Sequence, residues 1–313
     1  MNDRRFFRKL PTVLIIVAVI TPSLKAERPT FTHDVVYGHK DGLAMTFDVI
    51  TPKKQNGIGV LFMVSGGWYS RWFPAELAIR DGARLKNGFE RLTMRGFTVF
   101  LIRHGSAPRY KVPDAVADVR RAVRYIRLNA KKYGIDPDRL GAMGSSAGGH
   151  LSLMLGTTAD KGQPKAIDPV KQMGNRVAAV VAYFPPTDLR DIVGPSKPFP
   201  ALDFDPKLAE SVSPLLHVSE DDAPSLMIHG DKDRLVKLSH SENIKQAFDE
   251  KKVENNLIVI EGAGHGFRGD HEQQAIKAMV DWFEKHLLNT DANKKDTKLQ
   301  KTDTKKDDAK ESK

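Results

Sequence analysis

Short apolar runs alternate with longer amphipathic stretches between residues 29 and 288. Six of the short runs are apolar at almost every position, which is typical of strands that a parallel sheet buries on both faces. These runs are Gly59–Val64, Phe97–Ile102, Leu140–Met143, Val177–Tyr183, Ser225–His229 and Leu257–Ile260. The pattern therefore predicts six central strands.

Two earlier runs, His33–Gly38 and Leu43–Ile50, alternate apolar and polar residues on either side of an Asp41-Gly42 turn, which predicts an antiparallel hairpin at a sheet edge. Amphipathic helices are predicted between the strands. Strands that alternate with helices predict a mostly parallel, doubly wound α/β sheet. The predicted helices are Asp81–Arg95, Pro113–Lys132, His240–Lys251 and Gln273–His286.

Residues 184–223 interrupt this rhythm, because they contain seven prolines and no long periodic run. Such an irregular insertion at the carboxyl end of a strand is either a lid over a site or an ordinary surface excursion. Its place after the strand at Val177–Tyr183 favours a short lid-like insertion.

A chain of 313 residues with 40% hydrophobic content can bury one large core, so two domains are not required. The absence of cysteine excludes disulfides, a thiolate nucleophile and a thiolate metal site. We expect a single domain over residues 27–288, with 184–223 as its insertion.

Residues 1–26 have the pattern of an export signal: a basic start, an apolar run from Leu10 to Ile20, and a cleavage region that ends at Ala26. The apolar run is short for a membrane span, which favours cleavage over an uncleaved anchor. We therefore expect a periplasmic or secreted protein with no stable membrane span after cleavage.

The net charge of +10 resides largely in the two ends. Residues 1–26 carry about +4, and residues 289–313, a Lys- and Asp-rich tail expected to be disordered, carry about +2. The remaining charge of about +4 is ordinary for a folded domain, so it indicates no nucleic-acid partner.

Gly144-Ser145-Ser146-Ala147-Gly148 reads as G-x-S-x-G between a predicted strand and a predicted helix. A serine on such a sharp turn presents its hydroxyl at the edge of the sheet, and the turn leaves room only for glycine on both sides. The hydroxyl needs a base to take its proton and an acid to orient that base.

The base and the acid are expected after later strands, in the chain order serine, acid, histidine. His265 follows the strand at Leu257–Ile260 in a glycine-rich loop, whereas His271 and His286 lie on or beside the last predicted helix. Asp231 and Asp233 both follow the strand at Ser225–His229. Either carboxylate qualifies by type, and Asp231 could instead brace its own turn.

An oxyanion intermediate also needs backbone N–H donors. Ala147 follows the candidate nucleophile, and Ser65-Gly66-Gly67-Trp68 follows an earlier strand, so Ala147, Gly67 and Trp68 are the candidate donors. The alternative is a plain Gly-Gly turn. The aromatic residues nearby either line a substrate pocket or pack beneath the insertion. The candidate pocket residues are Tyr69, Trp72 and Phe267.

With these residues assembled, the chain resembles the α/β-hydrolase superfamily over about residues 43–287. Within it, the chain is similar to bacterial carboxylesterases related to feruloyl and acetyl-xylan esterases. The segment that carries most of the resemblance runs from Val112-Pro113-Asp114-Ala115 through Tyr133-Gly134-Ile135-Asp136-Pro137-Asp138-Arg139 to Gly144-Ser145-Ser146-Ala147-Gly148-Gly149-His150-Leu151.

The resemblance implies an α/β-hydrolase fold with Ser146 as nucleophile, Asp233 as acid and His265 as base. It also implies Gly67, Trp68 and Ala147 as oxyanion donors. Two departures stand out: Ser65 occupies the place of the family's usual histidine in the oxyanion motif, and Arg103-His104 replaces the usual Tyr-Arg pair.

We therefore expect a serine esterase that needs no cofactor or metal and acts on small-molecule esters, including carbohydrate-linked ones. One alternative is a peptidase of the prolyl-oligopeptidase type, and another is a non-catalytic binding protein on the same scaffold.

Overall fold

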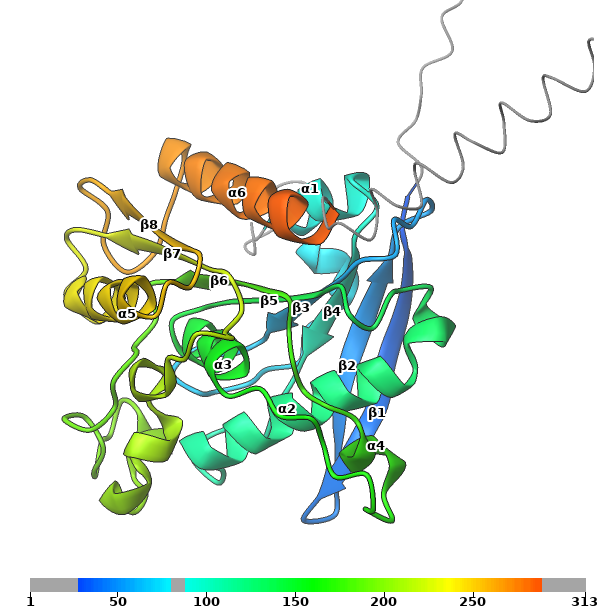
Figure 1. Cartoon of the computed structure of the whole chain (residues 1–313), viewed down its shortest axis with the longest axis horizontal. Coiled ribbons are helices and arrows are strands. Elements are labelled where there is room, and N and C mark those ends of the chain that lie inside the picture. The colour runs from blue at the N-terminus through cyan, green and yellow to red at the C-terminus, as the bar shows by residue number, and fades with distance from the viewer. Residues whose placement is uncertain (1–27, 80–87, 289–313) are drawn as a thin grey trace, which may run out of the picture.

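The computed structural model describes residues 28–79 and 88–288. Within these ranges eight strands form one sheet in the order β1-β2-β4-β3-β5-β6-β7-β8 (Figure 1). Strand β2 pairs antiparallel with β1 and β4, and all other pairs are parallel. The strands are β1 (Thr30–Lys40), β2 (Leu43–Thr51), β3 (Gly59–Met63), β4 (Thr98–Ile102), β5 (Leu140–Ser145), β6 (Ala179–Tyr183), β7 (Ser225–Gly230) and β8 (Asn255–Ile260).

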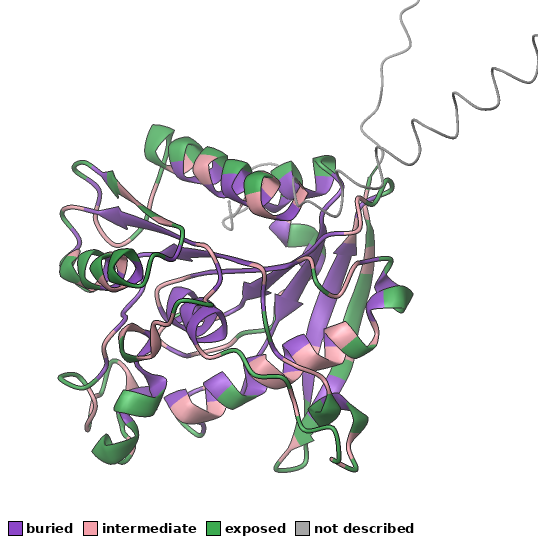
Figure 2. Ribbon diagram, in the orientation of Figure 1, coloured by how far each residue is buried: buried purple, intermediate pink, exposed green. Residues whose placement is uncertain are grey.

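Four of the central strands are buried along their whole length, as their apolar runs predict. Every residue of β3, β4, β6 and β7 is buried, whereas most of β1 is exposed or half-buried at the sheet edge (Figure 2). All six predicted strands and the predicted hairpin are present, with boundary shifts of a few residues. Five of the six strands are central, as predicted, but β8 forms the second edge of the sheet. The prediction that both faces of Leu257–Ile260 are buried is wrong, because Ile260 is the one residue of β8 that is buried.

Helices cover both faces of the sheet (Figure 1). The helices α2, α3 and α5 contribute to one apolar core and α1 and α6 to the other. Each predicted helix is present in the described residues, although the first part of Asp81–Arg95 lies outside them. The helices are α1 (Phe89–Met94), α2 (Val112–Leu128), α3 (Ala147–Thr157), α4 (Pro169–Gln172), α5 (Ser239–Glu250) and α6 (Asp270–Phe283).

Residues 184–223 follow β6 as a chain of short 3-10 turns, three of which have proline at their first position. Proline suits that position because its fixed φ is helical and its missing N–H would have no partner there. Buried Ala201, Leu202 and Val212 anchor the segment to the core beside α2 and α3. The turns are η3 (Pro200–Leu202), η4 (Pro206–Leu208), η5 (Glu210–Val212) and η6 (Pro214–His217).

The expected signal at 1–26 and the expected tail at 289–313 lie outside the described residues. Across the part of the chain that the structure does describe, no helix has the length and apolarity needed to cross a membrane.

Candidate active site

Ser146 stands alone between the end of β5 and the start of α3, in a strained backbone conformation with φ of 55° and ψ of −119°. The glycines on either side allow this turn. A Cβ at Gly144 would lie 2.4 Å from the carbonyl carbon of Gly148, and one at Gly148 would lie 2.7 Å from the carbonyl oxygen of Met63. The turn therefore holds the Ser146 hydroxyl at the carboxyl edge of the sheet.

The structure brings Ser146, His265 and Asp233 together in one hydrogen-bonded chain. His265 Nε2 lies 2.9 Å from Ser146 Oγ, and His265 Nδ1 lies 2.7 Å from Asp233 Oδ2. Because an ionised carboxylate can only accept, Nδ1 carries the proton and Nε2 is free to accept from the serine hydroxyl. Ser146 Oγ is thereby aligned with an imidazole nitrogen that can take its proton.

Asp233 is held in place by more than His265. Its Oδ1 accepts from the N–H groups of Leu235 and Val236 at 2.8 and 3.0 Å. Burial acts to raise the pKa of the Asp233 carboxyl, but the hydrogen bonds from His265 and these two N–H groups outweigh it and lower the pKa. The carboxylate therefore stays ionised where it faces the imidazole.

Asp231, the other acid that the sequence left open, has a different partner. Its Oδ1 accepts from the N–H of Gly262 at 2.6 Å, which ties the loop after β7 to the loop after β8. No hydrogen bond joins it to His265 within the described residues. Asp231 thus braces the loop that carries His265.

Gly67 and Trp68 form the centre of a tight turn in which Gly66 and Tyr69 exchange both backbone hydrogen bonds at 3.0 Å. Both central residues have positive φ, 57° and 59°, as a type I′ turn requires. Among the described residues, their N–H groups have no acceptor. Ala147 is the first residue of α3, where an N–H has no intrahelical acceptor either. These three N–H groups are available to a bound oxyanion.

The aromatic candidates lie in different surroundings. Trp72 is 59% exposed and its indole donates to Asp34 of β1 at 3.2 Å. Tyr69 is half-buried against the core, and Phe267 packs behind Phe184 with ring centroids 5.3 Å apart. The substrate contact expected of Tyr69, Trp72 and Phe267 stays a prediction.

Two further aromatic residues at the site were not found from the sequence. The Phe184 ring lies 4.5 Å from the His265 ring, centroid to centroid. Phe199, from residues 184–223, lies so close to Gly67 that a Cβ there would be 3.0 Å from its ring. Both belong to the insertion, which has no periodic pattern that would predict which side chains face the site.

His150 is a fully buried histidine. It links the turn at Gly67 and Trp68, which we call the oxyanion turn, to the insertion at residues 184–223. Its Nε2 donates to the carbonyl of Val212 at 2.7 Å, and its Nδ1 accepts from the Trp68 indole at 3.3 Å. Burial lowers the pKa of His150 to about 4, so the ring is neutral at pH 7. His150 therefore positions Trp68 from inside the protein.

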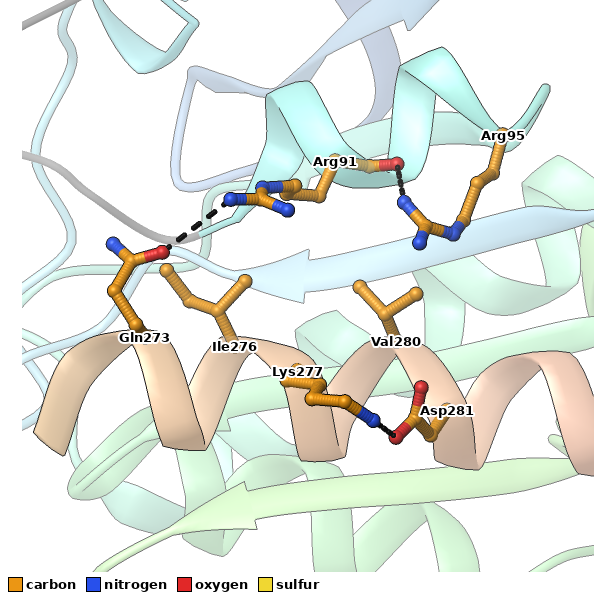
Figure 3. Close-up of a pocket in the computed structure, with 7 residues that line it drawn as sticks. All are labelled: Arg91, Arg95, Gln273, Ile276, Lys277, Val280 and Asp281. Carbon is orange, nitrogen blue, oxygen red and sulfur yellow. Dashed lines mark hydrogen bonds and ion pairs between the residues drawn. The ribbon is translucent and has the colours of Figure 1, made fainter. Parts of the chain in front are cut away.

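A separate hollow of about 430 Å³ lies between α1 and α6, on the other side of the sheet from α3 (Figures 1 and 3). Its cations already have acceptors, since Arg95 pairs with Glu284 and Lys277 with Asp281. It contains no nucleophile and base pair among the described residues, and no group of three or more metal-ligating side chains occurs in residues 28–79 and 88–288. Its lining residues are Arg91, Arg95, Gln273, Ile276, Lys277, Val280 and Asp281.

Comparison with known proteins adds independent information. The model of the family described as BD-FAE matches residues 47–248. Esterase LipC of Mycobacterium tuberculosis is 28% identical over 259 residues, which are 78% of this chain and 62% of LipC. The chain thus spans less than two thirds of the length of this relative.

Solved structures share the fold. A truncated carbohydrate esterase from gut microbiota superposes with a TM-score of 0.70 at 28% identity, over 85% of this chain and 99% of that one. An acetyl ester-xyloside bifunctional hydrolase from Caldicellulosiruptor lactoaceticus gives 0.66 at 23% identity, over 84% and 98%, and supports the fold alone.

Proposed function

This chain belongs to the BD-FAE family and has the α/β-hydrolase fold, and from that premise we propose that it hydrolyses carboxylic esters through an acyl-enzyme. The observation that carries the proposal is the hydrogen-bonded chain from Ser146 through His265 to Asp233. It joins three loops at one edge of the sheet. The backbone N–H groups of Gly67, Trp68 and Ala147 have no acceptor among the described residues.

In the proposed reaction, Ser146 Oγ attacks the ester carbonyl while His265 Nε2 takes its proton. Asp233 stabilises the imidazolium that forms. The negative charge that develops on the carbonyl oxygen accepts hydrogen bonds from the N–H groups of Ala147, Gly67 and Trp68. His265 then protonates the leaving alcohol, and a water activated in the same way releases the acid.

Hydrolysis of p-nitrophenyl acetate and butyrate tests this proposal, together with labelling of Ser146 by a fluorophosphonate probe. We expect turnover and one labelled serine in the wild type, and loss of both in Ser146→Ala. A folded wild-type protein with neither turnover nor label would overturn the esterase proposal and favour a non-catalytic scaffold. Faster cleavage of peptide anilides than of esters would favour a peptidase.

For the substrate we propose small-molecule esters, including acetyl groups linked to carbohydrate. The 28% identical solved structure is that of a carbohydrate esterase, which supports this class. Acetate release from acetylated xylo-oligosaccharides, measured beside release from p-nitrophenyl acetate, tests the carbohydrate part of the proposal.

We also propose that the protein is exported to the periplasm or beyond, on the basic and apolar pattern of residues 1–26. Mass spectrometry of the protein from a cell fraction would give the mature N-terminus. An N-terminus after Ala26 in the exported fraction is the expected result, and an intact chain in the cytoplasm would contradict it.

A further inference from the structure

A second serine–histidine pair lies beside the candidate site. Ser65 Oγ is 2.8 Å from His104 Nε2, and His104 Nδ1 is 2.8 Å from the carbonyl oxygen of Gly105. Because that carbonyl can only accept, Nδ1 carries the proton and Nε2 accepts from the Ser65 hydroxyl. The protonation pattern is the same as that of Ser146 and His265.

The surroundings of this pair differ from those of the candidate nucleophile. His104 is only 4% exposed, and a neutral carbonyl takes the place of the carboxylate that Asp233 supplies to His265. An imidazolium at His104 would therefore be buried without a countercharge, and burial lowers the pKa of His104 to about 4. Such a ring is a poor base at neutral pH but a good hydrogen-bond acceptor.

The pair also belongs to a set of contacts between two loops, the one after β3 and the one after β4. Ser70 Oγ accepts from the backbone N–H of His104 at 3.2 Å and donates to the Val64 carbonyl at 2.7 Å. The Ser106 hydroxyl accepts from the Ser70 N–H at 3.0 Å. These contacts flank the turn at Gly67 and Trp68 on both sides.

A fourth contact reaches the turn itself, because the Ala107 N–H donates to the Trp68 carbonyl at 3.2 Å. The loop after β4 thus fixes the carbonyl side of Trp68, one of the candidate oxyanion donors. Ser65 lies two residues after the end of β3 and directly before the turn, and its hydroxyl contacts His104. A shift of the turn by an ångström would misplace the donors.

We propose that His104 is a positioning residue that fixes the oxyanion turn by accepting the hydrogen bond of Ser65. Its buried imidazole comes from the loop after β4 and contacts Ser65, the serine that begins the Ser65-Gly66-Gly67-Trp68 segment. The proposal rests on the proposed esterase function, because it assigns the turn a role in that reaction.

Four variants test the brace: Ser65→Ala, His104→Leu, the double variant, and His104→Gln, whose amide oxygen can still accept from Ser65. We expect Ser65→Ala and His104→Leu each to lower kcat for p-nitrophenyl acetate by about 10-fold, with little change in KM. The rate of fluorophosphonate labelling should fall by about the same factor. Ser65→Ala and His104→Leu remove the same hydrogen bond. The double variant should therefore lose no more kcat than His104→Leu alone. His104→Gln should recover part of kcat.

Ser225→Ala is the control, because it removes a hydroxyl hydrogen bond of a fully buried serine, to the Ala223 carbonyl at 2.9 Å. That hydroxyl lies at the start of β7, at the opposite end of the strand from the candidate site. The control should keep wild-type kcat. Thermal unfolding of all variants separates a loss of turn geometry from a loss of fold.

Wild-type kcat and labelling rate in a folded Ser65→Ala variant would overturn the brace while leaving the esterase proposal intact. Losses in Ser65→Ala and His104→Leu that add in the double variant would also overturn it. Fluorophosphonate labelling of Ser65 in Ser146→Ala would instead identify the pair as a second nucleophile. A wild type with neither turnover nor label would overturn the esterase proposal and this inference with it.

Discussion

Two aspartates stand two positions apart after β7, and their contacts give them different tasks. Asp233 accepts from His265, whereas Asp231 accepts from Gly262 in the loop that carries His265. Spacing along the chain cannot separate them, because both follow the same strand. The separation comes from the loop after β8, which presents an imidazole to one carboxylate and a backbone N–H to the other.

We therefore expect opposite results from two conservative substitutions. Asp233→Asn should lower kcat for ester hydrolysis by about 10³–10⁴-fold, because the amide no longer holds His265 in the tautomer that accepts from Ser146. Asp231→Asn keeps an oxygen that can accept from Gly262, so kcat should stay within about threefold of wild type. Steady-state kinetics with p-nitrophenyl acetate measures both.

Unfolding midpoints of the two variants serve as the control for this comparison. An Asp231→Asn variant that loses as much kcat as Asp233→Asn, with an unchanged midpoint, would contradict the different roles assigned to the two aspartates.

At the scale of elements, regular patterns made the fold predictable. The apolar runs that become β3 and β4 are buried along their whole length, and the amphipathic periods that become α2 and α6 lie on opposite faces of the sheet. The strand-to-helix turn at Ser146 follows from two glycines that the sequence displays. The 3-10 turns of residues 184–223 were missed because each is only three or four residues long.

Two side chains near the candidate site could not be predicted from the sequence, because they reach it through contacts between distant segments. Phe199 lies against Gly67, and His104 holds Ser65, across more than 30 positions of the chain. Phe199 belongs to no motif. His104 stands in the Arg103-His104 pair that departs from the family's usual Tyr-Arg, but it precedes the acid, which excludes it as the base by chain order. Their part in the site depends on tertiary packing alone.

The contact between Phe199 and Gly67 predicts a change in substrate range. The Phe199→Ala variant should open space beside a candidate oxyanion donor, so the ratio of kcat/KM for hexanoate to that for acetate esters should rise about 10-fold. A series of p-nitrophenyl esters from acetate to octanoate measures this ratio.

Phe204→Ala is the matched control, since Phe204 is a half-buried phenylalanine of the same insertion that packs on the core. It should leave the ratio unchanged. A chain-length profile of Phe199→Ala that matches the wild type would show that this ring does not limit the acyl or alcohol group.

At the scale of the whole molecule, the fold buries two neutral histidines close to the loops that form the candidate site. His104 lies in the loop after β4 and His150 in α3, and burial lowers the pKa of each to about 4. Both rings donate one proton to a carbonyl and accept from a second group, so each has its hydrogen bonds only while neutral. Protonation therefore opposes the folded state.

This predicts that protonation of His104 and His150 destabilises the fold at mildly acidic pH. An unfolded histidine has a pKa near 6.5, so the unfolded chain binds more protons than the folded chain between about pH 6.5 and pH 4. The free energy of unfolding should be constant above that window and fall within it, by on the order of 2 kcal/mol per histidine at pH 5. Urea unfolding at pH 7.5 and pH 5 measures the difference.

The His150→Gln variant isolates one of the two contributions, because an amide can accept from Trp68 and donate to Val212 but does not titrate in this range. Its stability should fall less between pH 7.5 and pH 5 than that of the wild type. The His271→Gln variant, at an exposed position of α6, should keep the wild-type difference. A wild-type free energy of unfolding that is equal at the two pH values would contradict the account, since two buried neutral histidines require the folded state to resist protonation.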